Sequence, residues 1–164
     1  MKKEEIVLGA DHAGFAAKEF IKMFLQGLNY RVCDAGAYFK EKRDDYPDYV
    51  KKVALEVKSG GNKIGILACG TGIGASIAAN KFPGIRAALV CNARDARLSK
   101  EHNNANVLVL GGRPFERGKV RKIVLTWLKA RFAGGRHARR LKKIERIEKM
   151  FMITAKPRKG SGRK

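Results

Sequence analysis

Short apolar runs alternate with amphipathic segments along most of the chain. The runs rich in Val, Ile, Leu and Ala predict strands over residues 6–10, 30–34, 64–68, 86–91 and 107–110. Between them, apolar residues recur at helical spacing, which predicts helices over residues 15–28, 49–57, 75–79, 92–100 and 115–132. This alternation predicts an α/β fold with a five-stranded parallel sheet that is covered by helices on both faces.

One stretch, residues 64–84, joins a buried strand to a glycine-rich turn. The apolar run ends at Cys69, and the turn Gly70-Thr71-Gly72-Ile73-Gly74 leads into a helix of small residues. Backbone N–H groups can approach a ligand closely at such glycines, and a helix N-terminus favours negative charge. The turn is therefore predicted to hold an anion, and the same features would stabilise the thiolate of Cys69 as a base or nucleophile. The alternative is that Cys69 only fills a tight turn, because free cysteines are often buried and inert.

Residues 70–75 also fit the pattern G-x-G-x-x-A, which is typical of dinucleotide-binding folds. In those folds the pattern follows the first strand, whereas here it follows the third predicted strand. The next predicted strand ends at Cys91-Asn92, without the acidic residue that would bind a ribose. A nicotinamide-dependent enzyme is therefore disfavoured.

Several polar residues follow directly after predicted strands. They are Asp11, His12, Cys69, Asn92 and Arg113. Because ligands bind beyond the carboxyl ends of parallel strands, these loops could converge on one crevice. His102 lies in a further polar segment, and a cluster of arginines that includes Arg136 and Arg140 follows a double glycine. Local hydrogen bonds and a solvated helix start are the simpler interpretations, although an arginine cluster also suits a phosphate dianion.

The composition adds a strong positive charge to this picture. With 36 Lys and Arg against 15 Asp and Glu, the 164-residue chain has a formal net charge of +21, which attracts phosphorylated metabolites, nucleic acid or acidic membrane surfaces. Residues 1–152 are predicted to form a single domain, and residues 153–164 a basic, disordered tail. The domain is expected to end in a helix over roughly residues 137–152, with an apolar stripe that packs on another subunit: Leu141, Ile144, Ile147 and Phe151.

The cysteines and the apolar runs also bear on where the protein works. The chain has no apolar run long enough to span a membrane and no signal-peptide pattern. Its three cysteines are an odd number without a CxxC pair, which argues against a disulfide framework and a zinc site. Cys33 and Cys91, in or beside apolar strands, are predicted to lie in the core. We therefore predict a cytoplasmic protein.

Several segments occur in a fixed order between about residues 6 and 150: GADHAGFAAK, DDYPDY, CGTGIGASIAANKFPGIRAA, LSKEHNNANVLVLGGR and GGRHARR. In these segments the chain closely resembles the type B ribose-5-phosphate isomerases, a family that also includes allose-6-phosphate and galactose-6-phosphate isomerases. The resemblance implies a Rossmann-like three-layer α/β/α sandwich and a homodimer or dimer of dimers, with each active site at a subunit interface. It also implies that no cofactor or metal is required.

The resemblance further implies a role for each site residue. Cys69 matches the catalytic base that moves a proton between carbons 1 and 2 of the open-chain sugar, and Thr71 matches the residue that shuttles the hydroxyl proton. The turn that includes Gly70, Gly72 and Gly74 would bind the enediolate oxygen through its backbone. His102, with Asp11 nearby, matches the group that opens the sugar ring; Asn103 and Tyr46 match sugar contacts; and His12, Arg113, Arg136 and Arg140 match phosphate ligands.

The expected activity is the interconversion of ribose 5-phosphate and ribulose 5-phosphate. An isomerase of a six-carbon sugar phosphate is the alternative within the family, since pocket depth cannot be deduced from the sequence. A nucleic-acid-binding protein is the alternative outside it, motivated by the net charge of +21. The basic tail has no interleaved aromatic residues, so nucleic acid is expected to bind there only non-specifically.

Overall fold

The computed structural model of the chain describes residues 4–39 and 44–154. Its strands are β1 (Glu5–Ala10), β2 (Arg31–Asp34), β3 (Lys63–Cys69), β4 (Ala87–Leu89) and β5 (Val107–Gly111). Its helices are α1 (Phe15–Gly27), α2 (Tyr46–Lys58), α3 (Ile73–Ala79), α4 (Ala93–Asn103), α5 (Arg117–Lys129) and α6 (Gly135–Thr154). Every strand that the sequence pattern predicts is therefore present, and a helix follows each one.

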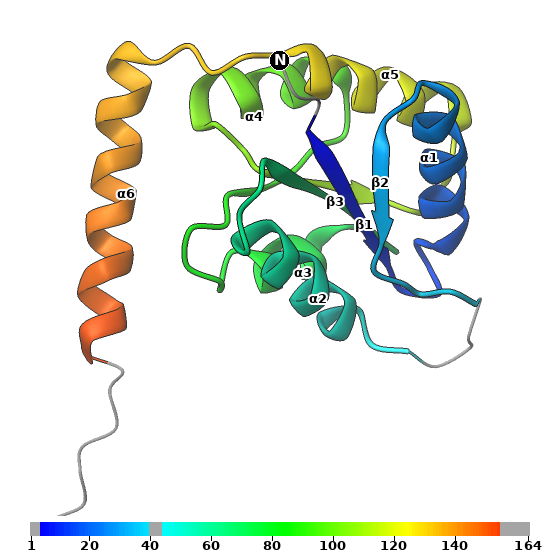
Figure 1. The fold of residues 1–164 in the computed structure, drawn as a ribbon, viewed down its shortest axis with the longest axis horizontal. Coiled ribbons are helices and arrows are strands. Elements are labelled where there is room, and N and C mark those ends of the chain that lie inside the picture. Colours follow the sequence, from blue (N-terminus) through cyan, green and yellow to red (C-terminus); the bar gives the residue numbers. More distant parts are fainter. Residues whose placement is uncertain (1–3, 40–43, 155–164) are drawn as a thin grey trace, which may run out of the picture. The chain divides into compact units, whose positions relative to one another are not determined.

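The strands form one parallel sheet in the order β2-β1-β3-β5-β4 (Figure 1). From β1 the chain continues to β2 on one side, whereas from β3 it continues to β4 and β5 on the other. The neighbouring strands β1 and β3 thus form a topological switch point, and open α/β sheets bind ligands beyond the carboxyl ends of the strands at such a point. There Ala10 pairs with Ala68, and Cys69 pairs with Gly111, so the loops after three strands begin side by side.

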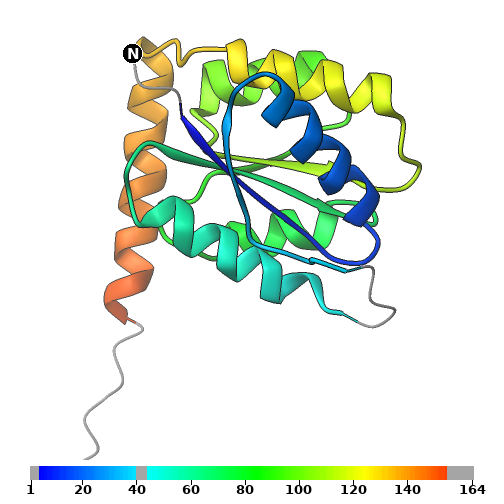
Figure 2. The same cartoon turned by 45° about the vertical axis from the view of Figure 1, so that its right-hand side comes forward.

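Alternate residues of the strands face two helical layers. Ile6 and Leu8 belong to the core beneath α1, α4 and α5, which contains the fully buried Trp127. Val7 and Leu67 belong to the core beneath α2 and α3. Figure 2 shows the same two layers from a second direction. Because both faces of the parallel sheet are covered, its central strands β1, β3 and β5 are largely buried and apolar, and the predicted three-layer α/β/α fold is confirmed.

The helices differ from the predicted boundaries by a few residues, and for two of them the cause is clear. The second helix begins at Tyr46, earlier than expected, because Pro47 lies in its first turn, where a missing N–H removes no helical hydrogen bond. The fourth helix continues beyond its predicted end at residue 100 into the polar segment that contains His102, and it ends before Asn104, whose φ of 45° is left-handed.

The prediction that Cys91 lies in the core is wrong. β4 is an edge strand that ends at Leu89, so Cys91 falls in the turn after it and is exposed. Cys33 is half-buried, and the thiols of Cys33, Cys69 and Cys91 are all free. Within residues 4–39 and 44–154 there is no helix long and apolar enough to cross a membrane. The same residues contain no group of three or more His, Cys, Asp and Glu side chains that could hold a metal ion.

The chain divides after Ala133 into two compact units, and α6 is the described part of the second. Three side chains of its predicted apolar stripe, Ile144, Ile147 and Phe151, are exposed in the single chain. α6 extends to Thr154, slightly beyond the predicted end of the helix. The rest of the predicted tail lies outside the described residues, so its disorder and the single-domain assignment stay predictions.

Candidate active site

The loops after β1, β3 and β5 meet with their main chains in contact. The N–H of Gly112 donates to the carbonyl oxygen of Cys69 over 2.7 Å. A Cβ on Gly112 would lie 2.7 Å from the carbonyl oxygen of Ala13, and one on Gly14 would overlap the Ala68 carbonyl group. Only glycine allows so close an approach, and the result is a compact edge at the switch point.

Cys69 is the last residue of β3 and lies on the α2–α3 side of the sheet. The residue is only 4% exposed, so its side chain is buried in the single chain. Such a thiol is sheltered from bulk water, which limits side reactions.

The turn after Cys69 is tight, as its glycines predict. Gly72 has a φ of +80°, a left-handed conformation that a side chain rarely adopts, and α3 begins at the next residue. The hydroxyl oxygen of Thr71 accepts the N–H of Ile73 over 3.3 Å, so this exposed side chain is held at the start of the helix. The strand–turn–helix arrangement is therefore confirmed, and anion binding by the turn stays a prediction.

Tyr46, the first residue of α2, lies against this turn. A Cβ on Gly74 would be 2.7 Å from the hydroxyl oxygen of Tyr46, so the phenol covers the start of α3. A phenol both donates and accepts hydrogen bonds, which suits contact with a sugar hydroxyl. The residue is 37% exposed and therefore open to a ligand.

The loop after β1 is fixed by two carboxylates. Oδ1 of Asp11 accepts the N–H groups of Ala13 and Gly14, at 3.0 and 2.9 Å, and so fixes the turn that leads into α1. Oδ1 of Asp44 accepts the backbone N–H of His12 at 2.9 Å and lies 2.6 Å from its ring Nδ1. Both residues that the sequence places after β1 are thus held in defined positions at the switch point.

Asp44 is the one residue of this group that sequence reasoning missed. It stands 32 positions from His12, so no local pattern could have paired them; the segment DDYPDY was noted without a role for this carboxylate. Burial alone would raise the pKa of Asp44, but hydrogen bonds from the backbone and ring of His12 and from Tyr49 hold the pKa below its ordinary value.

Arg113 and Asn92 also follow strands, but only Arg113 lies at the candidate site. The backbone N–H of Arg113 donates to the carbonyl of Gly70 over 3.1 Å, and its side chain is exposed, so it belongs to the candidate site. Oδ1 of Asn92 accepts the N–H of Asp95 over 2.9 Å, and its amide donates to the Asp95 carboxylate over 2.7 Å. Asn92 thus caps α4, as predicted, and its polar atoms are engaged there.

His102 and Asn103 lie at the opposite edge of the sheet. α4 begins after β4 at the carboxyl edge and ends before β5 at the amino edge, where Gly65 at the start of β3 donates to the carbonyl of Asn106 over 2.9 Å. Its 11 residues span about 16 Å at ~1.5 Å per residue. Within one chain the fold therefore does not bring His102 to Cys69.

Arg136 and Arg140 are exposed on α6, in the second compact unit. The residues assembled at the switch point of one chain are therefore Asp11, His12, Asp44, Tyr46, Cys69, Gly70, Thr71, Gly72, Gly74 and Arg113.

Known proteins match this chain over almost all of its length. A family model described as Ribose/Galactose Isomerase matches residues 6–144. The ribose-5-phosphate isomerase B of Escherichia coli (strain K12) is 46% identical over 148 residues, which cover 90% of this chain and 97% of that protein. The chain belongs to the ribose/galactose isomerase family.

Solved structures of this family share the fold of the chain. Ribose-5-phosphate isomerase B of Clostridium thermocellum matches with a TM-score of 0.87 and 51% identity, covering 90% of this chain and 99% of that one. Ribose-5-phosphate isomerase B of Mycoplasma genitalium, solved with bound ribulose-5-phosphate, matches with a TM-score of 0.86 and 42% identity, covering 91% and 99%. The Rossmann-like sandwich implied by the sequence resemblance is therefore the fold of this chain.

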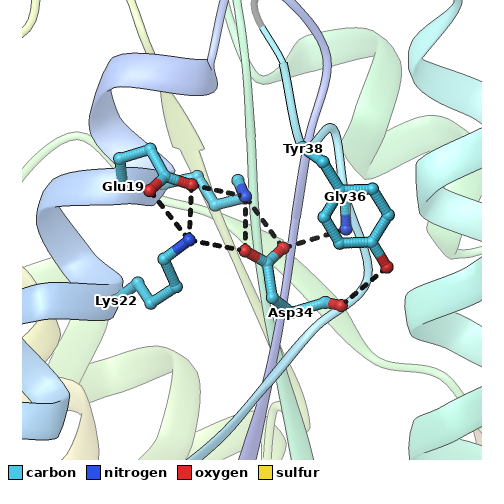
Figure 3. Close-up of polar contacts among 6 residues, drawn as sticks. Glu19, Lys22, Asp34, Gly36 and Tyr38 are labelled. Carbon is cyan, nitrogen blue, oxygen red and sulfur yellow. Dashed lines mark hydrogen bonds and ion pairs between the residues drawn. The ribbon is translucent and has the colours of Figure 1, made fainter.

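The chain also has a partly buried ion-pair network between α1 and the end of β2 (Figure 3). The ammonium of Lys18, a residue only 1% exposed, lies 2.8 and 2.7 Å from the two carboxylate oxygens of Asp34. Glu19 and Lys22 complete the network, with contacts of 2.7 to 2.8 Å. The N–H of Gly36 donates to Asp34 over 2.9 Å.

The network fixes the end of β2, and the residues after β2 hydrogen-bond to the last residue of β1. Just beyond Asp34, the carbonyl of Gly36 accepts the N–H of Ala10 at 2.8 Å, and the N–H of Ala37 donates to the carbonyl of Ala10 at 2.7 Å. Burial alone would raise the pKa of Asp34, but Lys18, Lys22 and the N–H of Gly36 hold the pKa below its ordinary value. The ionised carboxylate therefore stabilises the folded state.

Replacing Asp34 by asparagine is expected to cost about 3 kcal/mol of folding free energy at pH 7, because it leaves the buried Lys18 short of a counter-charge. The folded-state pKa of Asp34 is depressed, so its contribution is present above the ordinary value of 3.8 and is lost as the pH falls below it. Urea unfolding at pH 7 and at pH 3 should show a difference between wild type and variant that shrinks in acid.

Glu56→Gln is the matched control for Asp34→Asn. Glu56 pairs with Lys63 over 2.7 Å, but its side chain is 45% exposed, so solvent screens the pair. This change should have a much smaller effect at both pH values. Equal losses for the two variants would mean that burial of the Lys18–Asp34 pair is not what makes it important.

Proposed function

We propose that the protein is an aldose–ketose isomerase that interconverts ribose 5-phosphate and ribulose 5-phosphate through an enediolate intermediate. Family membership supports the reaction class, and relatives named ribose-5-phosphate isomerase B support the substrate. The observation that carries the proposal is the placement of Cys69 at the switch point, followed by a glycine turn that Tyr46 covers.

In the proposed mechanism, Cys69 is the base that takes a proton from one of carbons 1 and 2 and returns it to the other. Thr71 moves the hydroxyl proton, and backbone N–H groups between Gly70 and Gly74 stabilise the enediolate oxygen. A positioned base of this kind contributes typically 10²–10⁴-fold, and fixed donors at the developing charge add to that. The short separation between Cys69 and the turn suits both tasks at once.

The phosphate would be bound away from the reacting carbons, by His12, Arg113, Arg136 and Arg140. Binding energy from a remote group can position the carbons for reaction. His102, together with Asp11, would open the sugar ring, while Asn103 and Tyr46 contact the sugar. This division of roles needs one tunable base, one oxyanion site and one anion anchor.

A coupled assay of the purified protein on ribose 5-phosphate, allose 6-phosphate and galactose 6-phosphate tests the proposal. We expect the highest kcat/KM with ribose 5-phosphate. A higher value for either hexose phosphate would instead make the protein a six-carbon isomerase, and no turnover of any of them would reject the isomerase assignment.

We further propose a homodimer or a dimer of dimers whose active sites are shared between subunits. In one chain His102 and Asn103 lie at the amino edge of the sheet and Cys69 at the carboxyl edge. A second copy could supply the missing groups from its own α4. The exposed stripe of Ile144, Ile147 and Phe151 on α6 gives each copy an apolar surface that association would bury.

Subunit exchange gives a direct test of a shared site. Cys69→Ser and His102→Ala protomers should each be inactive alone, and a mixture should regain part of the wild-type activity, because some interfaces then hold both native residues. Exchange is followed by mass spectrometry of differently labelled subunits. Complete exchange without recovered activity would place each site within a single chain.

Outside this reaction, we propose that the protein works in the cytoplasm and binds nucleic acid only non-specifically, through its basic tail. The net charge of +21 supports electrostatic binding of any polyanion. Such binding should weaken steeply with salt, and a salt titration of RNA binding measures this.

A further inference from the structure

One oxygen of Asp44 holds His12 at two points. Oδ1 accepts the backbone N–H of His12 at 2.9 Å and lies 2.6 Å from the ring Nδ1. The side chain of Asp44 is 6% exposed, whereas that of His12 is 32% exposed. A buried carboxylate therefore contacts one ring nitrogen of a histidine whose side chain is partly exposed and accessible to a ligand.

This contact decides which ring nitrogen carries a hydrogen. Hydrogen bonds from His12 and Tyr49 keep the pKa of Asp44 below its ordinary value despite burial, so the group is ionised at neutral pH. An ionised carboxylate can only accept, and a hydrogen must therefore lie on Nδ1 of His12. The second nitrogen, Nε2, is left for a ligand, and a carboxylate behind a histidine also balances the charge of the protonated ring.

The Asp44–His12 pair lies at the edge of the sheet where the substrate is proposed to bind. His12 follows β1 at the switch point, next to the loops that hold Cys69 and Arg113. Asp44 stands just before Tyr46, whose phenol lies against Gly74. One carboxylate thus joins the loop after β1 to the segment that leads into α2.

We propose that Asp44 is a positioning residue for the phosphate of the substrate, holding the ring of His12 so that Nε2 meets a phosphate oxygen. The inference rests on the proposed function, in which His12 is a phosphate ligand. Asp44 acts only through His12 and does not touch the substrate. Without the imidazole between them, its negative charge would repel a phosphate dianion, so the two residues work as a unit.

Steady-state kinetics of Asp44→Asn test this role. The amide oxygen can still accept the backbone N–H of His12, but it cannot balance an imidazolium. We expect KM for ribose 5-phosphate and the inhibition constant of inorganic phosphate to rise together, by about tenfold, with kcat changed by less than about twofold. Asp45→Asn is the matched control: this neighbouring carboxylate is exposed, makes no capping hydrogen bond, and should leave both constants unchanged.

The double variant shows whether Asp44 works through His12. Asp44→Asn added to His12→Ala should cause no further loss of phosphate affinity, because the ring that Asp44 holds is already absent. Fully additive losses, or wild-type constants in Asp44→Asn, would overturn the proposal. A merely structural carboxylate would instead lower the Tm and kcat together, without a selective change in KM.

Nuclear magnetic resonance reports the contact in the wild-type protein itself. The chain has three histidines, so spectra of ¹⁵N-histidine-labelled protein can be assigned by single substitutions. We expect a hydrogen-bonded Nδ1–H for His12 that disappears in Asp44→Ala, which removes the acceptor altogether. Failure to find it in the wild type would contradict the proposal even if the variant does not fold.

The proposed function and this inference can fail separately. If the wild type does not isomerise ribose 5-phosphate, the proposed function is wrong, and direct titration with inorganic phosphate still tests the pair. Weaker phosphate binding by Asp44→Asn than by Asp45→Asn would support it, and equal binding would overturn it.

Discussion

Replacing Cys69 by serine is expected to lower kcat by at least about 100-fold while the protein remains folded, since loss of a positioned base costs typically 10²–10⁴-fold. A hydroxyl surrenders its proton far less readily than a thiol, whereas its similar size should preserve the packing beneath α2 and α3. The coupled isomerase assay measures kcat, and thermal unfolding shows whether the variant keeps its stability.

Cys91→Ser provides the control for this substitution. Cys91 is the exposed cysteine of the chain, and the same chemical change there should leave kcat close to that of the wild type. A Cys69→Ser protein that retained about half of the wild-type activity would exclude Cys69 as the base.

Removing α6 is expected to have an effect of similar size. A chain that ends after Gly135 lacks both Arg136 and Arg140, and each charge-assisted contact to a phosphate is worth about 1.5–3 kcal/mol. Loss of the pair should lower kcat/KM by more than about 100-fold, because 1.4 kcal/mol corresponds to about tenfold. The assay is run beside size-exclusion chromatography, since the stripe of α6 is also proposed to be covered on association.

Three further variants separate the contribution of α6 from that of its arginines. A chain that ends after Thr154 keeps α6 whole and should match the full chain in kcat, KM and oligomeric state. Arg136→Ala and Arg140→Ala in the full chain should each raise KM about tenfold without changing the oligomeric state. If the chain that ends after Gly135 were active, neither arginine could be an essential phosphate ligand.

The fold could be predicted because the central strands β1, β3 and β5 are buried on both faces and the helices on one, which leaves two distinct periodicities in the sequence. The errors have local causes. Proline usually interrupts a helix, but Pro47 lies in the first turn of α2, where it is accepted. Cys91 continued an apolar run, yet β4 is a short edge strand, and nothing in the local pattern distinguishes an edge from a centre.

The candidate site was predictable only in part. The convergence of Asp11, Cys69 and Arg113 followed from one rule, that the carboxyl ends of parallel strands share an edge. The pairing of His12 with Asp44, 32 positions away, depends on how α2 packs, which no single-sequence pattern contains. The proposed role of His102 came from family resemblance alone, whereas that of the α6 arginines rested on the resemblance and on the suitability of an arginine cluster for a phosphate dianion.

The position of β5 has a consequence for how the protein is made. β5 is the last strand in the sequence but lies between β3 and β4, and the residue after it supplies the N–H that binds the Cys69 carbonyl. Chains grow from the amino terminus, so the segment that carries Cys69 emerges well before this partner exists. A ribosome that stalls after β4 would release a chain whose central strand β3 exposes an open edge to other chains. Such fragments would be aggregation-prone substrates for cellular quality control, and they would lack the strand that completes the candidate site.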